Sequence, residues 1–227
     1  MQNNDNENID PHNKETILVC CAHADDETIG MGATINKYSL EGKEIITVIF
    51  SFGEKSSPWL KTEDLIMDRK KEAKSIGEFL GSSETIFLGL ADANLQNEIK
   101  DPKIKEVLKR ILIRFKPDKI FTHSGEDPHI SGDHKAVNKI VLETMQEFDK
   151  DKKIPVYVFE VWNVVNELKP AIYVDVSKTF SKKIEAMKKY KGQKTSIYPL
   201  LIPVYVRAIL AGFANHCRFA EKFYKVR

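Results

Sequence analysis

The segment VCCAHADDETIGMG, residues 19–32, decides how this chain is interpreted. It begins inside an apolar run, residues 16–22, whose composition is typical of a strand buried on both faces. One imidazole and three carboxylates follow the run at once: His23, Asp25, Asp26 and Glu27. Carboxylates crowded at the end of a buried strand repel one another. We therefore expect a metal ion or a charged substrate group at this position.

Strand-like runs alternate with helical patterns along the rest of the chain. Runs rich in Ile, Val, Phe and Thr predict strands at 16–22, 44–50, 85–88, 119–122, 156–162 and 171–176. Amphipathic spacing and end signals predict helices at 28–41, 60–80, 102–115, 134–148 and 178–190. This alternation predicts an α/β fold, a Rossmann-like, mostly parallel sheet with helices on both faces, plus a C-terminal extension after about residue 178. We expect 1–15 to be a disordered tail and 16–227 to form a single domain.

Composition narrows the class of protein. A net charge of +2 over 227 residues gives no reason to expect a nucleic-acid or membrane partner. Two of the three cysteines, Cys20 and Cys21, are adjacent in the first predicted strand, a usage typical of a disulfide-free fold in a reducing compartment. We do not expect the polar start of the chain to act as a signal peptide. We therefore expect a cytoplasmic protein.

The segment IYPLLIPVYVRAILAGFA, residues 197–214, is apolar over nearly the length of a membrane span. Pro199, Pro203 and Arg207 disfavour a regular spanning helix. We expect no membrane span here, and a segment that is buried against the neighbours of the sheet or between subunits. If the chain does not cover it, a homo-oligomer is the natural outcome.

A second polar motif, HSGEDPHISGDH at residues 123–134, follows the predicted strand 119–122. Ligands of open parallel sheets bind beyond the carboxyl ends of the strands, so both motifs are expected at one edge. A catalytic zinc site needs three protein ligands and an open position. His23 and Asp26 supply two of the three ligands. His134 is the best candidate for the third, with His123 and His129 as alternatives.

The remaining carboxylates of the two motifs have other candidate roles. Asp25 stands beside a ligand and is a candidate general base. Glu27 or Asp133 could orient a ligand imidazole. Glu27 could equally act only as a carboxylate stabilised by the N-terminus of a helix.

Several segments resemble one known family. AHADDE, residues 22–27, resembles the Ala-His-Pro-Asp-Asp-Glu signature of the LmbE-like, PIG-L superfamily of zinc-dependent N-acetylglucosaminyl deacetylases. The motif at 122–137 is similar to the second metal motif of that superfamily. Supporting similarities are DRKKEAKSIGEFLG at 68–81, FLGLADANL at 87–95 and FAEKF at 219–223.

The resemblance implies one Zn²⁺ ion held by His23, Asp26 and His134. It implies Asp25 as the general base and Arg69 as a residue that contacts the substrate. Ala24 replaces the usual proline, and Ser131 replaces the usual first histidine of the second motif, so His129 is the candidate for its role of stabilising the oxyanion. The implied reaction removes the N-acetyl group of an N-acetylglucosamine-containing substrate, a small molecule, and releases acetate and the free amino sugar.

Two other functions are compatible with the sequence. The same metal site could hydrolyse another amide or an ester. Alternatively, GMGATI at residues 30–35 could be a degenerate turn of a metal-free, Rossmann-like nucleotide-binding module. That motif lacks the third glycine of the fingerprint, and the acidic loop before it would repel a pyrophosphate.

Overall fold

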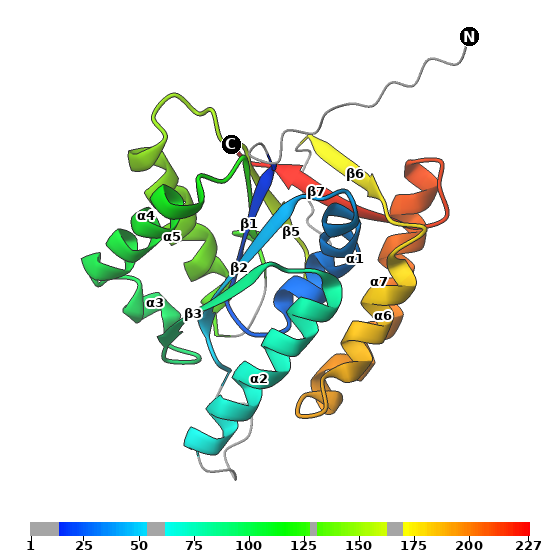
Figure 1. Ribbon diagram of the computed structural model, residues 1–227, viewed down its shortest axis with the longest axis horizontal. Coiled ribbons are helices and arrows are strands. Elements are labelled where there is room, and N and C mark those ends of the chain that lie inside the picture. Colours follow the sequence, from blue (N-terminus) through cyan, green and yellow to red (C-terminus); the bar gives the residue numbers. More distant parts are fainter. Residues whose placement is uncertain (1–13, 54–61, 128–130, 163–169) are drawn as a thin grey trace.

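The computed structural model describes residues 14–53, 62–127, 131–162 and 170–227. Strands and helices alternate through most of this part of the chain (Figure 1). The strands are β1 (Thr16–Cys21), β2 (Glu44–Ser51), β3 (Glu84–Leu90), β4 (Lys119–His123), β5 (Val156–Phe159), β6 (Ala171–Asp175) and β7 (Ala220–Lys225). The helices are α1 (Asp26–Leu40), α2 (Thr62–Leu80), α3 (Leu95–Glu98), α4 (Pro102–Phe115), α5 (Asp133–Phe148), α6 (Phe180–Lys189) and α7 (Lys194–Ala214).

The strands form one sheet in the order β3-β2-β1-β4-β5-β7-β6. β3, β2, β1, β4 and β5 are mutually parallel, whereas β7 runs antiparallel to both β5 and β6. The mostly parallel α/β sheet is therefore confirmed. The C-terminal extension is less peripheral than expected, because its last strand, β7, lies inside the sheet between β5 and β6.

Helices cover both faces of the sheet, as predicted. α1, α2, α6 and α7 lie on one side, and α3, α4 and α5 lie on the other (Figure 1). Successive side chains of a strand point to opposite faces, so the odd residues of β1, such as Val19, pack with α1, α6 and α7, and the even residues, such as Leu18, pack with α4 and α5. All residues of β1 are buried, which explains its uninterrupted apolar run.

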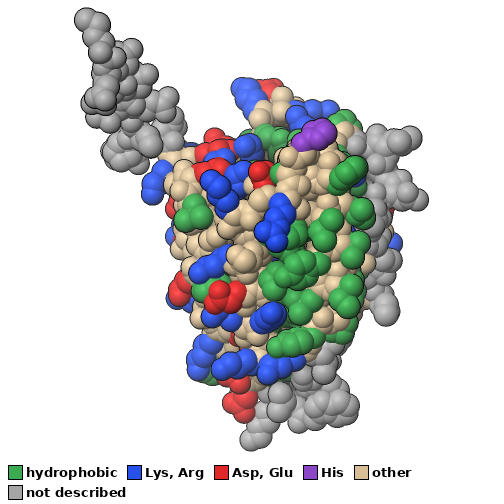
Figure 2. All heavy atoms as spheres, turned by 90° about the vertical axis from the view of Figure 1, so that its right-hand side faces the viewer, with side chains coloured by type: hydrophobic (Ala, Val, Ile, Leu, Met, Phe, Trp, Pro, Cys, Tyr) green, Lys and Arg blue, Asp and Glu red, His purple; other side chains and the backbone are tan. Residues whose placement is uncertain are grey.

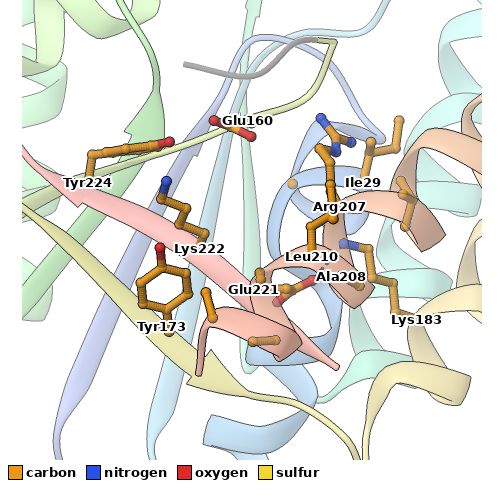
Figure 3. A pocket seen from close by; sticks show the side chains of 15 residues that line it. Ile29, Glu160, Tyr173, Lys183, Arg207, Ala208, Leu210, Glu221, Lys222 and Tyr224 are labelled. Carbon is orange, nitrogen blue, oxygen red and sulfur yellow. Dashed lines mark hydrogen bonds and ion pairs between the residues drawn. The ribbon is translucent and has the colours of Figure 1, made fainter. Parts of the chain in front are cut away.

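Helix α1 is interrupted at Met31, whose φ of −148° and ψ of 21° are not helical. The carboxylate of Glu221 accepts hydrogen bonds from Ala33 N at 3.3 Å and Thr34 N at 2.7 Å, just after the interruption. Lys183 Nζ lies 2.6 Å from Glu221 Oε1 and balances its charge (Figure 3). A residue of β7 thus supplies the acceptors for backbone donors next to the kink.

Helix α7 corrects the expectation for the apolar segment. One side packs into the core through Ile197, Leu200, Val204, Ala208 and Ala211, whereas the opposite side is exposed. Among the described residues, only Ser196–Ala214 is long and apolar enough to cross a membrane by length and composition, a test that core helices of soluble proteins also pass. Burial within the chain is therefore limited to the inner side of the segment. Coverage by a second subunit stays a prediction.

Candidate metal centre and cavity

The two polar motifs meet at the carboxyl ends of neighbouring parallel strands. β1 pairs with β4, so the turn from β1 into α1 lies beside the segment that connects β4 to α5. A cavity of about 290 Å³ opens at this edge, and its walls include His23, Asp25, Asp26, Arg69 and Trp162. The convergence expected from the position of both motifs is present.

His23, Asp26 and His134 offer ligand atoms that all lie within 4.8 Å of one another. Asp26 Oδ1 lies 3.3 Å from His134 Nε2, and Asp26 Oδ2 lies 3.6 Å from His23 Nδ1. The same Asp26 Oδ2 accepts a hydrogen bond from the backbone N–H of His23 at 2.8 Å, which holds the turn between the two donors. A buried carboxylate between two imidazoles is a donor set suited to a divalent cation.

His123, an alternative third ligand, has another partner. Its Nε2 accepts a hydrogen bond from Ala22 N at 2.9 Å and lies 3.2 Å from Asp26 Oδ2. Its ring stacks on that of His134, with centroids 3.9 Å apart. Burial, together with the charge of His134, lowers the pKa of His123 to about 4. The Nε2 lone pair is therefore engaged by the backbone, and this geometry favours His134. The other alternative, His129, lies outside the described residues.

Further carboxylates contact the ring nitrogens of His23 and His134 that do not face Asp26. Asp133 Oδ2 and Asp92 Oδ1 each lie 3.2 Å from His23 Nε2. Asp127 Oδ2 lies 3.1 Å from His134 Nδ1. Burial lowers the pKa of His134, but Asp26 and Asp127 outweigh that effect and raise it to about 9. Carboxylates in this position orient a ligand imidazole and increase its basicity.

Asp133 was expected to orient an imidazole, whereas no role was predicted for Asp92 or Asp127. Both lie in segments that resemble the family, FLGLADANL and HSGEDPHISGDH. Asp133 also accepts hydrogen bonds from Ala93 N at 2.9 Å and Leu95 N at 3.1 Å, so it ties the segment after β3 to the start of α5. Gly132 precedes it with a φ of +72°, a left-handed conformation that glycine adopts without strain.

Asp25 and Glu27 differ although only one residue separates them. Asp25 is partly exposed and lines the cavity, and burial together with the charge of Asp26 raises its pKa to about 6. Glu27 is buried, and its Oε1 accepts hydrogen bonds from Tyr190 Oη and Thr28 Oγ1, each at 3.2 Å. Glu27, in the first turn of α1, therefore contacts hydroxyl groups of α1 and of the end of α6, and its role in orienting a ligand imidazole stays a prediction.

Arg69 lies in α2 and is only 4% exposed. Its side chain borders the cavity together with His23 and Asp25, so it is not a surface charge of the helix. Its neighbour Glu72, a possible surface partner, accepts hydrogen bonds from the backbone N–H groups of Lys191 and Gly192 instead. A guanidinium in this position can contact a polar or anionic group of a bound molecule.

Comparison with known proteins identifies relatives of this chain. Residues 18–145 match the family described as PIG-L, GlcNAc-PI de-N-acetylase. The diacetylchitobiose deacetylase of Thermococcus kodakarensis is 23% identical over 230 residues, covering 93% of this chain and 84% of that protein. A 4-oxalmesaconate hydratase of Pseudomonas putida is 27% identical over 197 residues, covering 80% of this chain and 75% of that protein.

The fold is shared with solved structures. The N,N'-diacetylchitobiose deacetylase of Pyrococcus horikoshii superimposes with a TM-score of 0.77 at 22% identity, covering 93% of this chain and 84% of that one.

Proposed function

Because the chain belongs to the PIG-L family, we propose that it hydrolyses the N-acetyl group of an N-acetylglucosamine-containing substrate, releasing acetate and the free amino sugar. The observation that carries this proposal is the cluster of His23, Asp26 and His134, of which His23 and Asp26 line an open cavity. The similarity to diacetylchitobiose deacetylases supports an acetylated amino sugar as the substrate class.

His23, Asp26 and His134 are the proposed ligands of one divalent ion, most naturally zinc. Two neutral imidazoles and one carboxylate fit zinc and leave positions open to the cavity. When bound, such an ion supplies a Lewis acid that polarises a carbonyl group and makes water more acidic. Asp127 and Asp133 would orient the two imidazoles toward such an ion, because they contact the ring nitrogens that do not face Asp26.

Asp25 is the proposed general base. Its carboxylate faces the cavity beside Asp26, and its pKa of about 6 leaves it mostly ionised at neutral pH yet able to hold a proton. It accepts the proton of the attacking water and passes it to the leaving amine nitrogen. Arg69 binds hydroxyl or anionic groups of the substrate at the wall of the cavity. The oxyanion role of His129 stays a prediction.

A second candidate reaction is hydration of a double bond, because the hydratase of Pseudomonas putida is 27% identical to this chain. Both reactions need a positioned water and a base. They differ in the product, since only deacetylation releases acetate. Hydrolysis of another amide or of an ester also remains an alternative. A function as a metal-free nucleotide-binding module is disfavoured, because the carboxylates beside the cavity would repel phosphates.

The decisive experiment measures metal content and acetate release. We expect one zinc ion per chain in the purified protein and acetate from at least one member of a panel of N-acetylglucosamine conjugates. His23→Ala and His134→Ala should lose the metal while remaining folded. A protein that produces no acetate from the panel but hydrates an unsaturated dicarboxylate would instead favour the second reaction.

Asp25→Asn tests the base separately. An amide cannot take up the proton of water, so activity should fall by about 10²- to 10⁴-fold with the metal content unchanged. Asp151→Asn is the matched control, because the Asp151 side chain is 74% exposed. Near-native turnover of Asp25→Asn would indicate that another residue is the base, with Asp133 as the next candidate.

The cytoplasmic location of the protein also stays a prediction.

A further inference from the structure

The side of α7 that faces away from the core forms a continuous apolar surface, here called the outer face. It consists of Tyr198, Ile202, Tyr205, Val206, Ile209, Leu210 and Phe213. These side chains recur every three or four residues and therefore share one side of the helix. Phe213 is 84% exposed and Ile202 is 73% exposed. Figure 2 shows hydrophobic side chains gathered over this part of the molecule, with Lys and Arg side chains beside them.

No charged side chain interrupts the outer face. Every exposed residue in segment 197–214 is apolar. The one charged residue of that segment, Arg207, turns inward, where its Nη1 donates a hydrogen bond to Val161 O at 2.9 Å. Figure 3 shows Arg207 among the side chains that line a second cavity, together with Glu221 and Lys183. An exposed apolar area of this kind marks a contact with a partner or a membrane.

The charged side chains of α7 and of the segments at its two ends are all cationic. Between residues 186 and 220 the sequence has no Asp or Glu, but it has these cations: Lys188, Lys189, Lys191, Lys194, Arg207 and Arg218. All of them except Arg207 are exposed. The whole chain is nearly balanced, with 35 Lys and Arg against 33 Asp and Glu. The excess of cations is therefore a local property of α7 and its two ends.

This charge pattern discriminates between the possible occupants. A second copy docked by two-fold symmetry would place the same face on itself, so the cations of segment 186–220 would approach the same cations of the other copy, which is unfavourable. A spanning orientation would require α7 to leave the core, where Val204 and Ala208 are buried. An anionic bilayer accepts apolar side chains at the level of its headgroups and offers phosphates to the flanking cations.

We propose that the outer face of α7 docks this protein onto an anionic membrane surface, with the helix lying along the surface and not across it. The apolar side chains enter the boundary between headgroups and acyl chains. Lys191 and Lys194 at one end of α7, and Arg218 beyond the other end, contact lipid phosphates. Gln193 and Ser196, at the start of α7, line the catalytic cavity, so the docked protein would hold that cavity near the lipid.

Vesicle flotation of the full-length protein tests this proposal. Vesicles of phosphatidylcholine containing phosphatidylglycerol should carry the protein upward at low salt, and vesicles of phosphatidylcholine alone should carry much less. Ile202→Asp/Phe213→Asp and Lys191→Glu/Lys194→Glu should each reduce partitioning more than about tenfold, because each cation near the surface contributes roughly fivefold. High salt should weaken binding of the unmodified protein.

Matched controls distinguish vesicle binding through the outer face from nonspecific adsorption. Leu40→Asp/Ile113→Asp replaces side chains that are 75% and 61% exposed elsewhere, and Lys139→Glu/Lys150→Glu reverses two exposed charges away from α7. Both should float like the unmodified protein. A protein that does not float with anionic vesicles, or α7 variants that float as well as the controls, would overturn the proposal. So would an oligomer that ignores vesicles and dissociates in Ile202→Asp/Phe213→Asp on sedimentation.

Discussion

The buried ion pair between Lys183 and Glu221 gives a sharp test of how α1 is held. Its side chains are 4% and 5% exposed, and the Nζ–Oε1 distance is 2.6 Å. Burial lowers the pKa of Lys183 even though Glu221 opposes that shift. Glu221→Gln keeps an acceptor for Thr34 N but leaves the ammonium of Lys183 without its counter-charge. We therefore expect this single change to reduce the free energy of unfolding strongly.

The magnitude follows from the surroundings of the pair. Removing one partner of a buried pair typically costs about 3–5 kcal/mol. Both side chains line the cavity of about 190 Å³ shown in Figure 3, so water can partly solvate the remaining charge. We therefore expect about 3 kcal/mol for Glu221→Gln. Lys183→Met combined with Glu221→Gln should recover most of this loss, because no buried charge then remains.

Urea denaturation of the two single variants, the double variant and the unmodified protein measures the coupling energy. We expect a coupling energy of about 2–3 kcal/mol between the Lys183 and Glu221 side chains. Glu185→Gln is the matched control, because Glu185 pairs with Lys189 at 3.4 Å with both side chains mostly exposed, and its effect should be about 0.5 kcal/mol or less. A coupling energy below about 1 kcal/mol would refute the argument, since it would mean that water in the cavity already screens the pair.

Three further predictions concern the metal centre and its cavity. Asp127→Asn should weaken zinc binding about 10- to 100-fold in a chelator competition, because Asp127 holds His134 from behind. Zinc affinity should rise with pH from pH 7 to pH 9, because neighbouring carboxylates raise the pKa of both His23 and His134 and each imidazole must lose its proton to bind; a pH-independent affinity would contradict this. Arg69→Ala should raise KM more than it lowers kcat, and unchanged kinetics would exclude a substrate contact.

The parts of the fold that follow local rules could be predicted from the sequence. β1 is an apolar run because both of its faces are buried, and the parallel arrangement followed from the alternation of strands and helices. The convergence of His23 and Asp26 with His134 followed from one topological rule, that ligands bind beyond the carboxyl ends of parallel strands.

Features that depend on long-range pairing could not be predicted in this way. β7 joins the sheet antiparallel, and nothing in its short segment AEKFYK specifies a place between β5 and β6. α7 continues through Pro199 and Pro203, which were expected to interrupt it. Both prolines lie on the exposed side, where backbone carbonyls that lose a helical donor can reach water. Asp127 was not assigned because spacing alone does not show which carboxylate meets which imidazole.

The three adjacent carboxylates coexist because their environments differ. Asp26 is buried, but His134 and His123 more than offset that burial and hold its pKa well below the usual range. Burial raises the pKa of Glu27 to about 8, with Asp25 adding to the shift, so Glu27 is mostly neutral at pH 7. Asp25, with a pKa of about 6, stays mostly ionised and open to the cavity. The run of three acids thus contributes one ion-pairing carboxylate, one cavity carboxylate and one neutral hydrogen-bonding group, so the repulsion implied by their spacing is only partly present at neutral pH.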